Sequence, residues 1–183
     1  DDRPYAGHLY VQAEFFSILK EGGQFSISDL ADISMGVTGP SSGAGKLQKW
    51  YHRSLGITVP QGWHNQIGNE LTLGISRTRI WRLIRPLPGT LEAGIASHLT
   101  GVLGNEYTYA AGGVMFQLGT SLSSSSGPAN IHPGFSGNKY LPGDGKRAWF
   151  LFTGGEIRVI DVNIFLDGNT FSESHSVEKE PVV

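Results

Sequence analysis

Residues 39–56 read GPSSGAGKLQKWYHRSLG, a turn rich in glycine and serine that leads directly into a short helical pattern with a histidine. Three kinds of chemistry use segments of this type. Backbone amides of such a turn can hold a phosphate, a serine in it can act as a nucleophile, and the histidine can take a proton as a general base. The spacing of the residues distinguishes among the three.

The phosphate-binding pattern is not met. It requires G-x-x-x-x-G-K-[ST], in which the last hydroxyl binds magnesium. Gly45 and Lys46 match its centre, but Pro40 stands in place of the first glycine and Leu47 in place of the serine or threonine. We therefore expect no nucleotide site in this segment.

Residues 39–43, GPSSG, do match the serine pattern G-x-S-x-G, with Ser41 as the nucleophile. In hydrolases this pattern forms a strained turn between a strand of a parallel sheet and a helix. Such folds contain several crossover helices, whereas this sequence contains one convincing helical pattern. A turn that leads into the helix is therefore our interpretation, and a serine esterase that uses Ser41 remains an alternative.

The histidine chemistry is favoured by the position of His52 on the helix. A helical wheel gives one contiguous, mostly apolar stripe, which consists of Leu47, Trp50, Tyr51, Ser54 and Leu55. Gln48 and His52, four residues apart, lie together at the edge of this stripe. A histidine there is partly desolvated and can still face a cleft, as a general base must, although an ordinary boundary histidine is the alternative. Because a helix of about ten residues is unstable alone, we expect the stripe to pack against the wall of the fold.

Residues 60–70, PQGWHNQIGNE, place a dense group of polar side chains at the start of the next strand. Groups of this density are costly to bury unless they pair with one another or serve a site. The segment supplies the further candidates Trp63, Asn69 and Glu70, and it favours a functional interpretation of His52.

Most of the remaining sequence alternates apolar and polar residues with period two, as β-strands with one apolar face do. Leu9 and Val11, for example, flank Tyr10. Seven candidate strands result: residues 8–19, 24–37, 66–83, 91–103, 106–122, 148–153 and 156–166. Residues 119–144 are rich in serine, glycine and proline and predict a long surface loop.

Composition and strand length are compatible with a membrane barrel. Charged residues make up 16% of the 183 residues and the net charge is −2, so no broad basic surface for nucleic acid is present. No apolar run reaches the ~18 residues of a membrane-spanning helix, whereas several strands exceed the ~9–11 residues that cross a bilayer at a tilt. The polar faces carry acids, amides and histidines, which suits a wet interior. A soluble sandwich or lipocalin-like barrel shares the alternation and is the alternative.

Five segments carry a resemblance to a known family: DDRPYAGHLY, GVTGPSSGAGKLQKWYHRSLG, PQGWHNQIGNE, LGNEYTYAAGG and FLDGNTFSESHSVEKEP. Together they resemble the outer-membrane lipid A 3′-O-deacylases, most specifically in the Q-x-x-x-H helix followed by G-W-x-N-Q-x-x-N-E. The resemblance implies an all-β fold, namely an antiparallel transmembrane β-barrel of the bacterial outer membrane, twelve-stranded in the family, with one short helix that carries the site. We expect residues 1–183 to be a single barrel domain, truncated at both ends, that lacks the first and last strands.

The resemblance also implies a reaction. It is the removal of the 3′-linked acyloxyacyl group of lipid A near the outer leaflet, with calcium as cofactor and a mechanism like that of calcium-dependent phospholipases. His52 would be the base that activates water, and Gln48 would be its neighbour in the site. Trp63, Asn69 and Glu70 would support the loop or face the substrate. The implied partners are lipid A or lipopolysaccharide and the outer-membrane lipids, without nucleic acid, and the oligomeric state stays open.

Two departures from the family pattern matter. The Asn-Asp pair and the Tyr-Thr motif that contribute to the family's calcium and catalytic site belong to strands that would precede Asp1. Some members have a glutamate six residues after the histidine, where this sequence has Thr58. The calcium ligands are therefore unassigned, and the alternative function is a catalytically degenerate barrel that binds lipopolysaccharide.

The segment RTRIWRLIRP contains four arginines that could meet the phosphates or acidic sugars of lipopolysaccharide. They are Arg77, Arg79, Arg82 and Arg85. The alternation breaks between Arg79 and Arg82, so the four cannot share one face of a strand. Pairing with acids such as Glu92 is the alternative.

Overall fold

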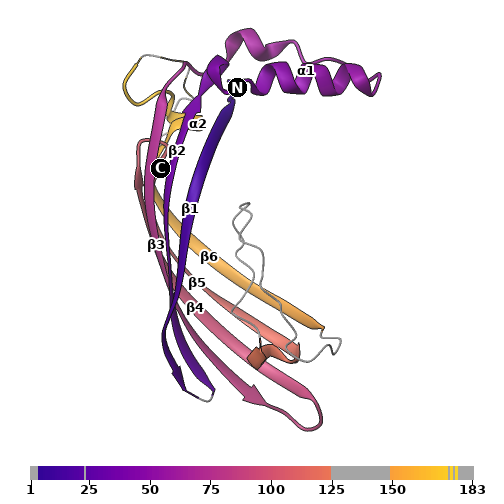
Figure 1. Ribbon diagram of the computed structural model, residues 1–183, viewed down its shortest axis with the longest axis vertical. Coiled ribbons are helices and arrows are strands. Elements are labelled where there is room, and N and C mark those ends of the chain that lie inside the picture. The colour runs from indigo at the N-terminus through magenta and orange to yellow at the C-terminus, as the bar shows by residue number, and fades with distance from the viewer. Residues whose placement is uncertain (1–3, 23, 125–148, 173, 175, 177–183) are drawn as a thin grey trace, which may run out of the picture.

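A computed structural model of the protein describes residues 4–22, 24–124, 149–172, 174 and 176. The described strands form one antiparallel sheet in which each strand pairs with its neighbour in the sequence (Figure 1). They are β1 (His8–Gly22), β2 (Phe25–Thr38), β3 (Leu71–Pro86), β4 (Leu91–Gly104), β5 (Tyr107–Thr120) and β6 (Phe150–Asn163). The helices are α1 (Ala44–Ser54), α2 (Ile164–Asp167) and the 3-10 helices Gly39–Ser42, Gly62–Asn65 and Leu122–Ser124.

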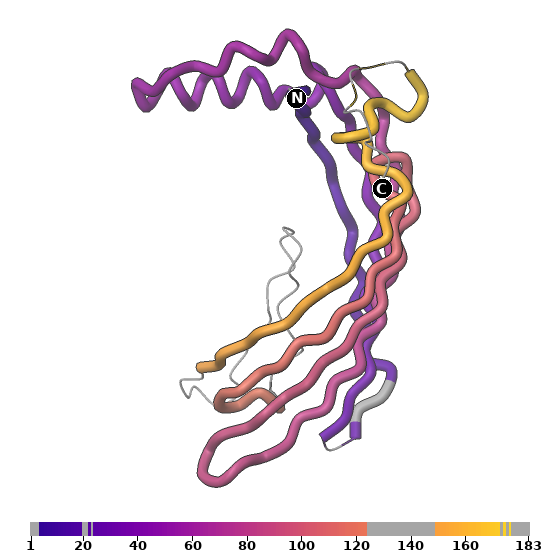
Figure 2. The backbone as a smooth tube through the Cα atoms, turned by 180° about the vertical axis from the view of Figure 1, so that it is seen from behind, coloured from indigo at the N-terminus to yellow at the C-terminus, as the bar shows by residue number. Residues whose placement is uncertain are grey.

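The sheet is curved into a wall with a hollow side, and α1 projects from one end of the wall over the hollow (Figures 1 and 2). β1 and β6 are the edges of the sheet among the described strands. The connection between β2 and β3 contains α1, so this connection positions the candidate site residues at one end of the wall.

The two faces of the wall differ in polarity in the sense opposite to that of a soluble protein. The outer, convex face exposes apolar side chains, which include Leu9, Val11, Ile33, Met35, Leu73, Ile75, Leu99, Leu103, Phe116, Ile157 and Val159. The inner face buries polar ones, which include Ser28, Thr72, Thr78, Thr100 and Gln117. Apolar-out and polar-in alternation is the pattern of a membrane β-barrel wall, and a soluble sandwich would show the reverse. No helix among the described residues is long and apolar enough to cross a membrane.

The strand count differs from the prediction. Residues 148–153 and 156–166 were expected to form two strands, but Phe150–Asn163 is one strand that continues through Gly154 and Gly155. These glycines interrupt the side-chain pattern without interrupting the backbone, since they pair with Met115 and Val114 of β5. The described residues therefore hold six strands instead of seven. Of the predicted loop 119–144, residues 125–144 lie outside the described part of the chain.

The predicted packing of α1 was wrong. No residue of α1 is buried, and the exposed fractions of Leu47 and Trp50 are 65% and 64%. Within the described part of the chain, α1 is held near its first residues by the segment that follows it, and the residues of the apolar stripe are exposed. The prediction of one helix over this segment was correct. The helix is held by contacts of Gly45 and Gln48 with Trp63, however, and not by the apolar stripe.

Candidate active site

The turn before α1 is held by the segment that follows the helix. The backbone N–H of Ser41 donates to Asn69 Oδ1 at 2.7 Å, and the Ser42 hydroxyl donates to Gly39 O at 2.6 Å. Gly43 then caps the N-terminus of α1 with φ of 73°, a left-handed conformation that favours glycine. Ser41 thus contributes its backbone to the turn. Among the hydrogen bonds of the described residues, none joins its hydroxyl to a histidine, as a serine nucleophile would require.

Trp63 fixes the first half of α1. Its indole Nε1–H donates to Gln48 Oε1 at 2.7 Å, and its ring lies 5.1 Å from the ring of Tyr5. A methyl group on Gly45 would come within 2.8 Å of the Trp63 ring, so glycine permits the close approach of the helix. Trp63 is 9% exposed, and its buried N–H therefore needs the partner that Gln48 supplies.

His52 is oriented by the way α1 ends. Gly56 adopts φ of 65°, its N–H donates to Arg53 O at 3.2 Å, and the N–H of Ile57 donates to His52 O at 3.0 Å. These two bonds form a Schellman motif, which reverses the chain after the helix. The reversal brings Thr58 O within 2.6 Å of His52 Nδ1. A carbonyl oxygen only accepts, so Nδ1 carries a proton, and in the neutral ring Nε2 is the acceptor.

Asn69 and Glu70 lie at the base of the helical segment. Asn69 accepts from the turn before α1, as described above. The buried carboxylate of Glu70 accepts from Asn105 Nδ2 at 2.9 Å and from the Phe171 N–H at 3.1 Å. Glu70 thereby joins the start of β3 to the turn between β4 and β5 and to the segment after α2. These hydrogen bonds of Asn69 and Glu70 hold segments of the fold together, and the functional roles of the two residues stay predictions.

Hydrogen bonds bring only part of the predicted set together. Gln48 and Trp63 are bonded directly, and Asn69 reaches the turn that begins α1. His52 bonds to the backbone of Thr58, and no hydrogen bond among the described residues joins it to another predicted site residue. His52 is half-buried and its ring contacts that of Tyr51 edge-on. The site is therefore a helix edge on which one histidine presents a free acceptor nitrogen.

Comparison with known proteins places the chain in a family. A family model described as "Outer membrane protein LpxR" matches residues 1–183. The chain belongs to the LpxR family. A solved structure, LpxR from Salmonella typhimurium, superposes with a TM-score of 0.74 at 23% sequence identity and covers 91% of this chain. The chain spans about half of that structure, 54% of its length. A search of curated proteins found no match.

LpxR membership confirms three predictions: the family, the antiparallel outer-membrane barrel fold, and the location in the outer membrane. At 23% identity the structural match concerns the fold alone. The single-domain interpretation of residues 1–183, its truncation at both ends and the roles of the site residues stay predictions.

Sequence reasoning missed a set of polar contacts that joins β1 of this LpxR-family chain to β3 and to the turn between β4 and β5. His8 Nε2 lies 3.0 Å from Thr72 Oγ1, and His8 Nδ1 lies 3.3 Å from Glu106 Oε1. Burial raises the pKa of Glu106, in the turn between β4 and β5, to about 7. The protonated carboxyl can then donate to Nδ1 while Nε2–H donates to Thr72. Period-two alternation groups His8 with Tyr10 on one face of its strand, but its partners come from segments distant in sequence, which a single-strand pattern cannot reveal.

The inner face also forms a cavity of about 410 Å³. Its lining includes Tyr10, Glu14, Asp32, Tyr109 and Arg158. Arg158 stacks over Tyr109 at 5.3 Å and pairs with Glu156, which also accepts from His98 at 2.8 Å. The mixture of both charges and tyrosines agrees with the wet interior that the sequence predicted.

The described residues do not fit a calcium site. Calcium takes six to eight oxygen ligands, usually with several carboxylates. No group of three or more histidine, aspartate or glutamate side chains that could hold a metal occurs in the described part of the chain. Near α1 the carboxylate of Glu70 is already occupied by two N–H donors. The ligands of the predicted calcium therefore stay unassigned.

Proposed function

We propose that this chain carries the base of an outer-membrane esterase that removes the 3′-linked acyloxyacyl group of lipid A. One observation carries the proposal: Thr58 O fixes the proton on His52 Nδ1, and Nε2 remains available to take a proton from water. The membership in the LpxR family and the resemblance to lipid A 3′-O-deacylases supply the substrate class.

In the proposed reaction His52 Nε2 accepts a proton from a water molecule as the water oxygen attacks the ester carbonyl. The tetrahedral intermediate then collapses, and the C–O bond to the sugar oxygen breaks. The protonated histidine returns its proton to that oxygen, so that the products are a fatty acid and a free hydroxyl group. Throughout, the Nδ1–H bond to Thr58 O stabilises the imidazolium that forms.

The surroundings of His52 suit a lipid substrate. Leu47, Trp50, Tyr51 and Leu55 are exposed on the same helix and offer apolar surface to acyl chains. Gln48 accepts from Trp63, so its amide NH₂ group is the part left to donate to a polar group of the substrate. We propose Gln48 as this donor and Trp63 as the residue that positions it.

Calcium dependence is part of the proposal only through the family resemblance. A calcium ion would supply positive charge for the oxyanion at the ester carbonyl. No step is assigned to it, because the described residues offer no ligand set.

A degenerate barrel that binds lipopolysaccharide without cleaving it is the second candidate. The observation in its favour is that no carboxylate among the described residues bonds to His52, whose orientation depends on a backbone carbonyl alone. A backbone carbonyl is sufficient to fix the tautomer, so we prefer the esterase.

The deciding experiment is mass spectrometry of lipid A from cells that express the complete reading frame, as wild type, His52→Ala or His64→Ala. His64 is a matched control because it is exposed and its Nδ1 also contacts a backbone carbonyl, that of Gln61 at 3.0 Å. We expect loss of one acyloxyacyl group with the wild type and with His64→Ala, and unchanged lipid A with His52→Ala.

Folding of each variant is checked by the heat-dependent shift of barrel proteins in gel electrophoresis. Full deacylation by a folded His52→Ala protein would refute the role of His52. Unchanged lipid A with the folded wild type would favour the degenerate barrel.

A further inference from the structure

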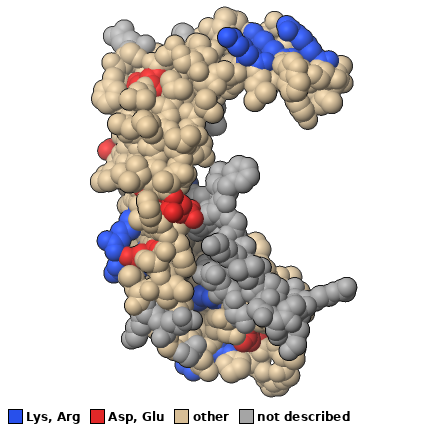
Figure 3. All heavy atoms as spheres, viewed as in Figure 1, with Lys and Arg blue, Asp and Glu red and all other residues tan. Residues whose placement is uncertain are grey.

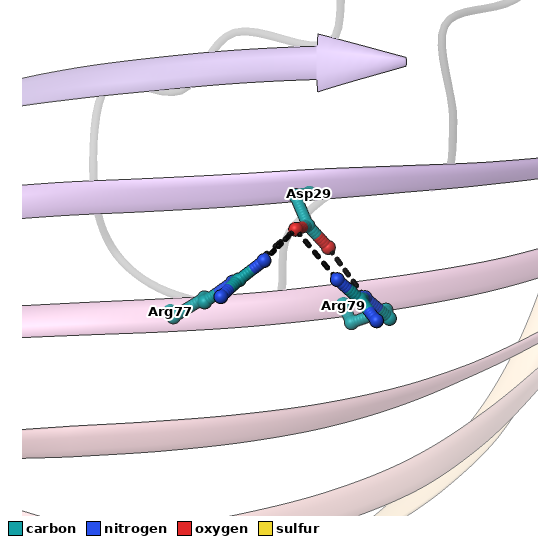
Figure 4. A network of polar contacts seen from close by, with 3 residues as sticks. All are labelled: Asp29, Arg77 and Arg79. Carbon is teal, nitrogen blue, oxygen red and sulfur yellow. Dashed lines mark hydrogen bonds and ion pairs between the residues drawn. The ribbon is translucent and has the colours of Figure 1, made fainter. Parts of the chain in front are cut away.

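The outer face of the wall contains a network of charged side chains from β2 and β3. Arg79 donates to both carboxylate oxygens of Asp29, with Nε–Oδ1 at 2.8 Å and Nη2–Oδ2 at 3.0 Å (Figure 4). Arg77 also donates to Asp29, with Nε–Oδ2 at 3.2 Å and a second bond from Nη2. Asp29 is 8% exposed at its side chain, whereas Arg77 is 64% exposed. The acid is therefore satisfied, and the cations around it remain accessible.

The network faces outward, not into the interior. Side chains alternate along a strand, and Leu30, Ser76 and Thr78 line the inner cavity. Their neighbours Asp29, Arg77 and Arg79 therefore lie on the apolar face. Figure 3 shows basic and acidic side chains midway along the wall, between surfaces of uncharged residues.

Arg82 lies on the inner side, which confirms that the four arginines of this segment do not share a face. The acid that pairs with Arg77 and Arg79 is Asp29, and Glu92 instead binds Ser123.

This position calls for a partner. Two arginines and one aspartate leave a net positive charge, which is costly on a lipid-facing surface and most costly at mid-depth. Arg77 and Arg79 follow the first residue of β3 by six and eight positions, or about 20–26 Å along the strand. Leu71, Leu73 and Ile75 precede them on the same face, and all three are exposed. The lipid phosphates at this end of β3 lie beyond that apolar surface, and an acidic side chain of a neighbouring protein in the membrane is the partner we consider.

This chain carries such an acid on the same face. Register places Arg77 opposite Gly101, Gly101 opposite Ala110, and Ala110 opposite Val159. Asp161 is the extra residue of a β-bulge, since the pairing with β5 passes from Ile160 to Val162; it is exposed and, unlike Ile160 and Asn163, it does not line the inner cavity. Gly101 and Ala110, which lie between the cation and the anion in this row, have no large side chains, and nothing lies within 4 Å of a methyl group placed on Gly101.

We propose that this face of the wall binds a second copy of the same chain, with Arg77 and Arg79 of one copy facing Asp161 of the other across Gly101 and Ala110. In a two-fold symmetric dimer each contact between the two copies occurs twice. One positive site and one negative site on each copy are therefore enough to pair the charges of both copies. The small residues let the two walls approach closely, as in other membrane interfaces. The proposal does not depend on the esterase activity.

Crosslinking between two differently tagged copies tests the proposal. The chain has no cysteine, so an introduced thiol is unique within these residues. One copy carries Arg77→Cys and the other Asp161→Cys, both expressed in full in outer membranes and treated with a short bismaleimide. We expect a product that carries both tags. The matched control replaces Asp161→Cys by Gly155→Cys, another exposed position of β6 on the outer face, and we expect several-fold less product.

Three outcomes would overturn the proposal: no product with both tags from folded proteins, equal yields with the Gly155→Cys control, or capture of the Arg77→Cys copy by a different protein only. A second measurement uses native electrophoresis. Gly101→Trp adds bulk where nothing lies within 4 Å, so the barrel should fold while the dimer is lost. Arg77→Glu and Asp161→Arg should each weaken the dimer, and the double variant should restore it. A dimer unaffected by all of these changes would place the interface elsewhere.

Discussion

His52 obtains its tautomer from backbone geometry, not from an acidic neighbour. Its Nδ1 contacts Thr58 O at 2.6 Å because Gly56 ends α1 in a left-handed conformation. The side chain at position 58, where some relatives carry a glutamate, is thus not needed to orient the ring. A serine, alanine or threonine there would present the same carbonyl.

Gly56 should therefore affect catalysis although it touches no substrate. A β-carbon at its φ of 65° costs about 1–2 kcal/mol and shifts the chain that delivers Thr58 O. We expect Gly56→Ala to lower kcat several-fold. Gly89→Ala is the control, because Gly89 has φ of 81°, lies in the turn between β3 and β4, and likewise has open space around it. Lipid A turnover measured beside thermal stability separates the two. Equal losses of activity in both variants would mean that only general stability is involved.

The sequence predicted this residue-scale picture in part. The i, i+4 spacing placed Gln48 and His52 on one edge of the helix, whereas the left-handed Gly56 that ends the helix was not predicted. The bond from Trp63 to Gln48 joins residues 15 positions apart, and it depends on how the two segments meet. Sequence periodicity contains no information on a tertiary contact between two segments, so the partner of Gln48 could not be predicted.

At the scale of elements, α1 is attached near its beginning and projects from there. Its contacts with Trp63 involve Gly45 and Gln48, whereas Trp50 and Leu55 are exposed. The sequence predicted a helix because the apolar residues recur with helical spacing. The prediction that this stripe packs against the wall was wrong. Helical spacing of apolar residues identifies an apolar face of the helix, but it does not identify which part of the protein covers that face.

Trp63→Phe isolates the attachment of α1. The ring that packs against Gly45 is kept, and the Nε1–H bond to Gln48 is removed. A hydrogen bond contributes about 1 kcal/mol, so α1 should detach roughly fivefold more often. Tryptic cleavage after Lys49 and Arg53 in the purified barrel measures this as a faster rate. Trp50→Phe should leave the rate unchanged, since Trp50 is 64% exposed. An unchanged rate with Trp63→Phe would show that the bond does not hold the helix.

At the scale of the whole molecule, the wall depends on polar contacts between strands on its inner side. The contact of Glu106 with His8 joins the turn between β4 and β5 to β1, across the sheet. Burial raises the pKa of Glu106 from 4.5 to about 7. Between pH 4.5 and about pH 7, therefore, Glu106 is protonated in the folded chain and ionised in the unfolded chain.

The contribution of Glu106 to stability should therefore fall as pH rises from about 4.5 to about 7, whereas the lowered pKa of the buried His8 acts in the opposite direction. Below this window both states are protonated and no penalty exists, and above it the folded state carries a buried charge that costs up to about 3 kcal/mol. The temperature of the heat-dependent gel shift, recorded from pH 5 to pH 8, measures the effect. Glu106→Gln keeps a neutral partner for His8 and should remove this part of the pH dependence. Parallel curves for wild type and variant would contradict the assignment.

The wall itself was the most predictable part of the molecule. Period-two alternation located the strands, and only the paired glycines at 154 and 155 led to one strand being counted as two. Which face meets lipid followed from the kinds of polar residues on the other face. The charged network of Asp29, Arg77 and Arg79 was not predictable as a network, since its acid and its bases lie on different strands about 50 positions apart.

Because the wall has an apolar outer face and a polar inner face, its strands should tolerate different substitutions on the two faces. Outward side chains such as Leu73, Ile75 and Leu99 contact fluid lipid, so one apolar residue can replace another there without leaving a cavity. Inward residues such as Thr72, Thr78 and Thr100 contact defined neighbours, and Thr78 and Thr100 share a hydrogen bond of 2.9 Å. A saturation mutagenesis map should therefore alternate between permissive and restrictive positions along each strand, with the permissive set apolar. In a soluble sheet the permissive set would be the polar one.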